Sequence, residues 1–166
     1  MNKLALPRRA LVLGGIGLIV VSRGVHAAET VSGRYAGNGK EVQLGFISAW
    51  PRDKFSGKDT IVIVVTEKDH SASKKPWFDA GFKKFGAALQ FSLTIPDGKL
   101  IGTEVGHPGL KRSPVSVSGS SIQAEGVTIT DKRVEGRFFT PKPGTFFDDV
   151  FEIDMKVAAD IRPRPA

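Results

Sequence analysis

The chain of 166 residues contains no cysteine. It therefore has no disulfide framework to staple a small exported domain, and it lacks the thiol that is acylated in lipoproteins. Two glycine-rich phosphate-binding patterns are also missing: G-x-G-x-x-G between an expected strand and helix, and G-x-x-x-x-G-K-[ST]. Nucleotide binding has no support, and a packed core must supply the stability of the fold.

Histidine is scarce, and only His70 and His107 lie beyond residue 27. Two imidazoles would need a carboxylate from Asp69, Glu67 or Glu104 to complete a metal site, and no i, i+4 spacing brings the imidazoles together. The acidic stretch near the C-terminus lacks the D-x-D-x-D-G loop that wraps calcium. We expect neither a metal site nor a cofactor.

The first 27 residues combine a basic start with one short apolar run. Lys3, Arg8 and Arg9 precede the run Ala10 to Val21, and the small residue Ala27 follows it. This order is typical of a secretory signal peptide, and the run is shorter than the roughly 20 residues that cross a bilayer as a helix. We expect this segment to be removed on export.

Export divides the chain into a signal peptide at 1–27 and a single antiparallel β domain at 28–166. We expect that domain in the periplasm or outside the cell, without a membrane span. The paired arginines resemble the twin-arginine export pattern, although Pro7 replaces the usual Ser or Thr. The general secretory and twin-arginine routes both stay open.

The excess of positive charge is modest once the leader is set aside. The whole chain has a formal net charge of +7, but four of its 24 basic residues lie in the leader, leaving 20 against 17 acidic residues. A net charge of +3 is too small to predict nucleic-acid binding. Solvated turns explain the recurring basic pairs, and the alternative is a patch that faces anionic lipid or cell-wall polymer. The pairs are Lys74-Lys75, Lys83-Lys84, Lys111-Arg112 and Lys132-Arg133.

Alternation of apolar and polar residues predicts strands along most of the domain. The stretches 41–50, 88–95 and 151–157 each have one apolar face and one polar face. Such half-buried strands favour antiparallel pairing, and only 61–65 is apolar enough to be covered on both faces. With shorter strands at 30–36 and 114–118, the domain is mainly β.

Two turns predict hairpins. Ile95-Pro96-Asp97-Gly98 separates 88–95 from 99–106, and Thr130-Asp131-Lys132 separates 126–130 from 133–140. About eight strands result, which fits either an antiparallel β-sandwich or a small β-barrel.

A short motif, V-x-G-R-aromatic, occurs at Val31–Tyr35 and again at Val134–Phe138. A glycine inside a strand admits a tight bend or a close neighbour, so we expect two curved or adjacent strands.

One segment, 76–86, has the period of a helix. Phe78, Phe82 and Phe85 recur at i, i+4 and i+7, Pro76 suits the first helical position, and Gly86 would end the helix. The phenylalanine stripe needs a hydrophobic surface to cover, for which an open end or face of the sheet is expected. The alternative is a membrane surface, favoured by nearby cations and an aromatic residue. These are Lys75, Lys83, Lys84 and Trp77.

Several segments between positions 30 and 110 resemble an uncharacterised family of small secreted bacterial proteins. The matching segments are Asn38-Gly39-Lys40, Thr66-Glu67-Lys68-Asp69, Pro76-Trp77-Phe78-Asp79-Ala80, Phe82 to Leu89 and Glu104-Val105-Gly106-His107. The resemblance implies secretion and brings no activity with it.

We expect a non-enzymatic binding or interaction module for an envelope protein or for a small apolar or anionic ligand. Aromatic anchors beside cations are typical of recognition patches. The candidate binding residues are Trp77, Phe78, Lys74, Lys75, His107, Lys111 and Arg112. The alternative is a small hydrolase or metal-dependent enzyme that uses His107, held at a strand end by Gly106-His107-Pro108-Gly109, with a nearby carboxylate.

Overall fold

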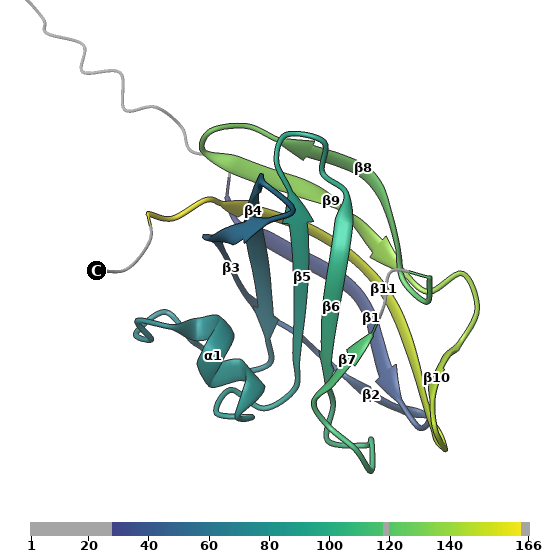
Figure 1. The fold of residues 1–166 in the computed structure, drawn as a ribbon. Coiled ribbons are helices and arrows are strands. Elements are labelled where there is room, and N and C mark those ends of the chain that lie inside the picture. The colour runs from purple at the N-terminus through teal and green to yellow at the C-terminus, as the bar shows by residue number, and fades with distance from the viewer. Residues whose placement is uncertain (1–27, 118–119, 164–166) are drawn as a thin grey trace, which may run out of the picture.

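The computed structural model describes residues 28–117 and 120–163, so the expected signal peptide at 1–27 lies outside the described residues. The described chain forms eleven strands and one short helix, arranged in two antiparallel sheets (Figure 1). The mainly β prediction is confirmed. Over the described ranges, no helix has the length and apolar character needed to cross a bilayer.

We call the six-stranded sheet sheet A and the five-stranded one sheet B. Sheet A has the order β2-β1-β11-β9-β8, with β10 paired to β11. Its strands are β1 (Thr30–Gly37), β2 (Lys40–Val42), β8 (Gln123–Ile129), β9 (Arg133–Phe139), β10 (Gly144–Phe146) and β11 (Asp149–Asp160). Sheet B has the order β3-β4-β5-β6-β7. Its strands are β3 (Phe46–Phe55), β4 (Lys58–Thr66), β5 (Ala88–Thr94), β6 (Leu100–Gly106) and β7 (Val115–Val117).

The main hydrophobic core lies between the two sheets. The rings of Phe91 on β5 and Phe138 on β9 stack across it with centroids 4.2 Å apart. Both sheets are open, and the isolated parallel bridge between Ala49 and Ile161 joins them at one corner. Of the two predicted architectures, the sandwich describes this arrangement.

The predicted strand at 41–50 is divided between the two sheets. Its first part is β2 in sheet A, its second part is β3 in sheet B, and the chain crosses between the sheets at residues 43–45. The expectation that only one face of this stretch is buried is also wrong. Ile47 faces the core while Ser48 and Trp50, on the opposite face, are buried as well. The reason is that a second layer covers the outer face of sheet B.

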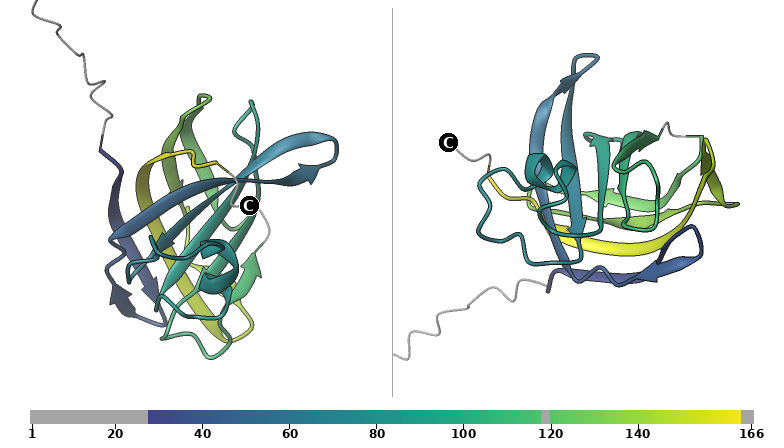
Figure 2. Two further views of the ribbon diagram at one scale, coloured as in Figure 1. Left: turned by 90° about the vertical axis from the view of Figure 1, so that its left-hand side faces the viewer. Right: turned by 90° about the horizontal axis from the view of Figure 1, so that it is seen from below.

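That second layer is helix α1 (Pro76–Gly81) with the turns that flank it, which lie on the outside of sheet B (Figure 2). Trp77 packs against Trp50 with ring centroids 5.9 Å apart, and Ala80 is buried against the outer residues of β4. Since its other face packs on the main core, β4 is covered on both sides. This confirms the expectation for 61–65.

Helix α1 is six residues long and ends well before the predicted residue 86. Lys83 and Gly86 both have positive φ, which turns the chain away from the helix. Because the helix stops early, the expected phenylalanine stripe does not form one packed face. Phe85 packs on the sheet, but Phe78 and Phe82 are 55% and 65% exposed.

Both predicted hairpins are confirmed. Gly98, with φ of +61°, donates its N–H to the Thr94 carbonyl in the β5–β6 turn. In the β8–β9 turn the Thr130 N–H donates to the Arg133 carbonyl at 2.8 Å. The repeated V-x-G-R-aromatic motif lies on β1 and β9, which flank β11 on its two sides.

The outer face of sheet A carries ion pairs that run across neighbouring strands. Arg34 on β1 pairs with Glu41 on β2 and with Glu152 on β11. Arg137 on β9 pairs with Asp154 on β11 at 2.8 Å and with Glu125 on β8 at 3.0 Å. Carboxylates of β11 thus pair with arginines of both flanking strands.

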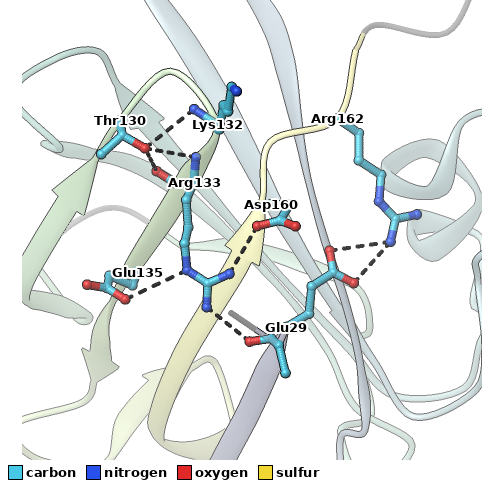
Figure 3. Close-up of polar contacts among 8 residues, drawn as sticks. Glu29, Thr130, Lys132, Arg133, Glu135, Asp160 and Arg162 are labelled. Atoms are coloured by element: carbon cyan, nitrogen blue, oxygen red, sulfur yellow. Dashed lines mark hydrogen bonds and ion pairs between the residues drawn. The ribbon is translucent and has the colours of Figure 1, made fainter. Parts of the chain in front are cut away.

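Figure 3 shows how both ends of the described chain are held beside the β8–β9 turn. Arg133 donates to the Ala28 carbonyl and to the Asp160 carboxylate, each at 3.0 Å. Arg162 pairs with Glu29 at 3.2 Å. These contacts hold residues near both ends of the described chain at the same corner of the sandwich.

Candidate functional site

The candidate binding residues lie on two segments at the end of sheet B where β5 begins and β6 ends (Figure 1). Lys74, Lys75, Trp77 and Phe78 belong to α1 and the loop before it. His107, Lys111 and Arg112 belong to the loop between β6 and β7. The structure brings only Trp77 and Phe78 from this set into one groove, which other residues complete.

The groove lies between α1 and the outer face of sheet B and has a volume of about 390 Å³. Its lining combines aromatic rings from the helix side with polar groups from the sheet. It is lined by Arg52, Trp77, Phe78, Gly81, Phe82, Gln90, Glu104, Pro114, Val115 and Ser116. A second hollow of about 340 Å³ shares Arg52, Gln90, Glu104 and Ser116, so the depression continues across β5, β6 and β7.

Strand register places the polar groups of the groove in one row. Gln90 on β5 lies opposite Glu104 on β6, which lies opposite Ser116 on β7. Gln90 Nε2 donates to Glu104 Oε2 at 2.7 Å and to the Trp77 carbonyl at 2.9 Å. The sheet and the helix therefore hold the amide in place. In the described part of the chain, Gln90 Oε1 and Glu104 Oε1 have no hydrogen-bond partner.

Arg52 supplies the positive charge of the groove. Its guanidinium carbon lies 5.7 Å from the centroid of the Trp77 ring, within the range of a cation–π contact. Among the residues that the structure describes, no carboxylate forms an ion pair with Arg52. The groove thus offers a cation, two acceptor oxygens and apolar ring surfaces to a ligand.

His107 lies in the interior and is 1% exposed. Its Nδ1 accepts the Gly109 N–H at 2.8 Å, and its ring meets Tyr35 edge to face with centroids 4.9 Å apart. Burial lowers the pKa of His107, and the nearby Lys40 backbone opposes this shift by favouring the protonated ring. Among the described residues, Nε2 of His107 has no hydrogen-bond partner.

The hydrolase alternative needs a carboxylate or a serine hydroxyl on the His107 ring. In residues 28–117 and 120–163 neither contacts it, and no group of three His, Cys, Asp or Glu side chains is placed to hold a metal ion.

Lys111 and Arg112 take part in a structural contact through their backbones. Both N–H groups donate to the carboxylate of Asp149 at 2.9 Å, and Asn38 Nδ2 donates to the same carboxylate at 2.7 Å. These hydrogen bonds, led by that of Arg112, lower the pKa of Asp149. The Arg112 side chain lies over the exposed ring of Phe147, 3.9 Å from its centroid.

The hydroxyl of Tyr35 is a buried polar group without a partner among the described residues, and burial raises the pKa of Tyr35 well above its ordinary value. We expect Tyr35→Phe to leave the free energy of unfolding unchanged or to raise it by up to about 1 kcal/mol, because no hydrogen bond is lost. Equilibrium unfolding in urea measures this. A loss of more than about 1 kcal/mol would show that the hydroxyl is bonded in solution.

A buried network surrounds His70, which lies in the loop between β4 and α1. Thr66 Oγ1 donates to the Lys68 carbonyl at 2.7 Å, so it accepts from His70 Nδ1, 2.6 Å away. His70 Nε2 then accepts from the hydroxyl of Ser48 at 2.7 Å, and that oxygen accepts from Trp50 Nε1 at 2.9 Å. This direction of donors holds the imidazole in one neutral tautomer.

Burial, together with nearby Arg162, lowers the pKa of His70 to about 4. The contact between Ser48 and His70 has the spacing of a nucleophile and its base, but Ser48 is fully buried and out of reach of a substrate. The network therefore secures the loop that carries α1.

Comparisons of this chain with protein-family models, with curated proteins and with solved structures found no match, so its function is inferred from its own geometry.

Proposed function

We propose that this protein is an exported, non-enzymatic binding module that holds its ligand in the groove between α1 and the outer face of sheet B. The observation that carries the proposal is the meeting of Trp77, Phe78 and Phe82 with Arg52 in one hollow of about 390 Å³. Export rests on the expected signal peptide at 1–27. The partner is a small ligand or an exposed group of an envelope protein.

The charges of the two sheets support this choice of face. On sheet A, Arg34 and Arg137 are already paired with carboxylates of neighbouring strands. Arg52 has no such partner among the described residues, so a ligand anion would not have to displace a carboxylate to reach it. These two arginines of sheet A are therefore satisfied, whereas the arginine of the groove is not.

The chemistry of the lining defines the ligand class. Aromatic faces favour a flat apolar group, and a guanidinium favours a carboxylate, sulfonate or phosphate. Acceptor oxygens of Gln90 and Glu104 favour a hydrogen-bond donor on the same ligand. A flat apolar molecule with one anionic group fits this lining. The walls are preformed, since Gln90 and the Trp50–Trp77 contact fix the helix to the sheet.

The dye 8-anilinonaphthalene-1-sulfonate is a suitable probe, because it joins fused aromatic rings to one anionic group. We expect Arg52→Ala to weaken its binding by about three- to tenfold, the equivalent of roughly 0.7–1.4 kcal/mol. Glu104→Gln should tighten it, since this change removes a negative charge and keeps an acceptor for Gln90. Fluorescence titration of the folded protein measures both effects.

The matched control is Arg112→Ala, which removes another arginine that lies over an aromatic ring. This control should leave dye binding unchanged. The proposal fails if Arg112→Ala weakens binding and Arg52→Ala does not, or if Arg52→Ala and Glu104→Gln shift the affinity in the same direction. Amide NMR spectra of each variant show that the native fold is retained.

A further inference from the structure

Helix α1 and the residue after it carry two exposed phenylalanines at the rim of the groove. The rings of Phe78 and Phe82 touch, with centroids 4.8 Å apart, and both are more than half exposed. The helix packs on the sheet through Ala80 and Trp77 instead. The exposed pair is therefore not needed to complete the core.

Three exposed lysines flank this pair in the sequence: Lys74 and Lys75 precede the helix, and Lys83 follows it. Within the described ranges none of them forms an ion pair. The carboxylate of the helix, Asp79, is already paired with Lys84 at 2.5 Å. We call Lys74, Lys75, Phe78, Phe82 and Lys83 the Phe–Lys patch. It combines exposed rings with uncompensated positive charge.

We propose that the Phe–Lys patch docks the folded protein on an anionic lipid surface. Aromatic rings enter the boundary between headgroups and acyl chains, while lysines around them stay at the level of the phosphates. Charge complementarity favours this occupant over a second copy of the chain, because two such patches would bring like charges together. The patch is small, so the binding is reversible.

This inference stands apart from the proposed function, although Phe78 and Phe82 also form one rim of the groove. Docking would place the opening of the groove close to the lipid surface. Arg52, which lies on β3, is outside the patch. An Arg52→Ala variant should therefore keep its lipid binding, which makes the two proposals separable.

Co-sedimentation of the purified protein with phospholipid vesicles tests the inference. We expect binding to vesicles of phosphatidylglycerol and phosphatidylcholine, weaker at high salt, and no binding to phosphatidylcholine alone. Each lysine near an anionic surface contributes about fivefold in affinity, the equivalent of about 1 kcal/mol. The triple variant Lys74→Gln, Lys75→Gln, Lys83→Gln should therefore lose on the order of 100-fold. The double variant Phe78→Ser, Phe82→Ser should bind weakly and only at low salt.

The matched control is Phe147→Ser combined with Lys142→Gln, since Phe147 is 72% exposed and lies on the turn between β10 and β11. This control should bind like the unchanged protein. The inference is overturned by equal binding to neutral vesicles, by no binding to either kind, or by patch variants that bind normally. Self-association that Phe78→Ser, Phe82→Ser abolishes would assign the patch to a second copy instead.

Discussion

Gly33→Ala is expected to destabilise the fold by about 3–5 kcal/mol, which would unfold a large fraction of a marginally stable domain. Gly33 lies on β1 opposite Met155 of β11 and has a φ of +130°, a conformation that L side chains rarely adopt. A Cβ at this position would overlap the carbonyl oxygen of Asp154. Because the obstacle is backbone of the central strand, the sheet cannot yield without losing pairing between β1 and β11.

The second copy of the motif provides the matched comparison. A Cβ on Gly136 would lie 2.9 Å from Cγ2 of Val127, and that side chain has more freedom to move than a strand backbone. We expect Gly136→Ala to cost about 1–2 kcal/mol, and Gly45→Ala, with open space around it, to cost less than about 1 kcal/mol. Urea unfolding of the three variants gives the order. A Gly33→Ala protein as stable as Gly45→Ala would show that β1 is not held as described.

As the pH is lowered, protonation of His70 is expected to reduce the free energy of unfolding at pH values above those that protonate the carboxylates. The pKa of His70 falls from 6.5 to about 4 on folding, so the unfolded chain binds more protons than the folded one between these values. The contribution of neutral His70 to the free energy of unfolding is fully present above pH 6.5 and is lost as the pH falls to about 4. The shift corresponds to about 3 kcal/mol of the free energy of unfolding.

Replacing His70 with alanine tests this account. The variant should lose most of the pH dependence between pH 6.5 and about 4. At neutral pH it should be less stable by about 2–4 kcal/mol, because a cavity opens and the Ser48 hydroxyl loses its acceptor. The burial of His107 acts in the same direction, so a small residual slope is expected. Histidine NMR titration identifies the ring involved, and a His70 that titrates near 6.5 would contradict the network.

Local patterns were sufficient to predict most of the strands and both predicted hairpins. Alternation in 151–157 survives in the structure because this strand has one face on the core. For 88–95 the expected exposed polar face is wrong, because α1 and its flanking turns cover part of the outer face of sheet B and bury Ala88 and Gln90 as well. The turn at Asp97-Gly98 forms as expected because its residues suit the required backbone angles. Where local preference and the final packing agree, the sequence is informative.

The division of 41–50 between two sheets has no local signal, because both parts suit a strand and only the packing decides which sheet each joins. The prediction of which helix residues pack on the sheet was wrong for a related reason. A six-residue helix has room for one packed side, and Trp77 and Ala80 occupy it in place of Phe78 and Phe82.

The groove depends on strand register, which periodicity does not reveal. Gln90, Glu104 and Ser116 are far apart in the chain and come together only when β5, β6 and β7 pair. Each of them appears in the sequence as an ordinary polar residue. The same holds for Ser48 and His70, which meet because β3 pairs with β4 and the loop after β4 folds back over both strands.

The corner that joins Arg133, Glu29 and Arg162 bears on how the protein would mature (Figure 3). Ala28 and Glu29 are exposed and precede the first strand, so neither sheet has to open to present them. A peptidase that cuts after Ala27 would meet an already folded substrate at an accessible margin. On the export that we propose, a domain folded before cleavage would still present Ala28 to solvent, so processing would not require the sandwich to unfold.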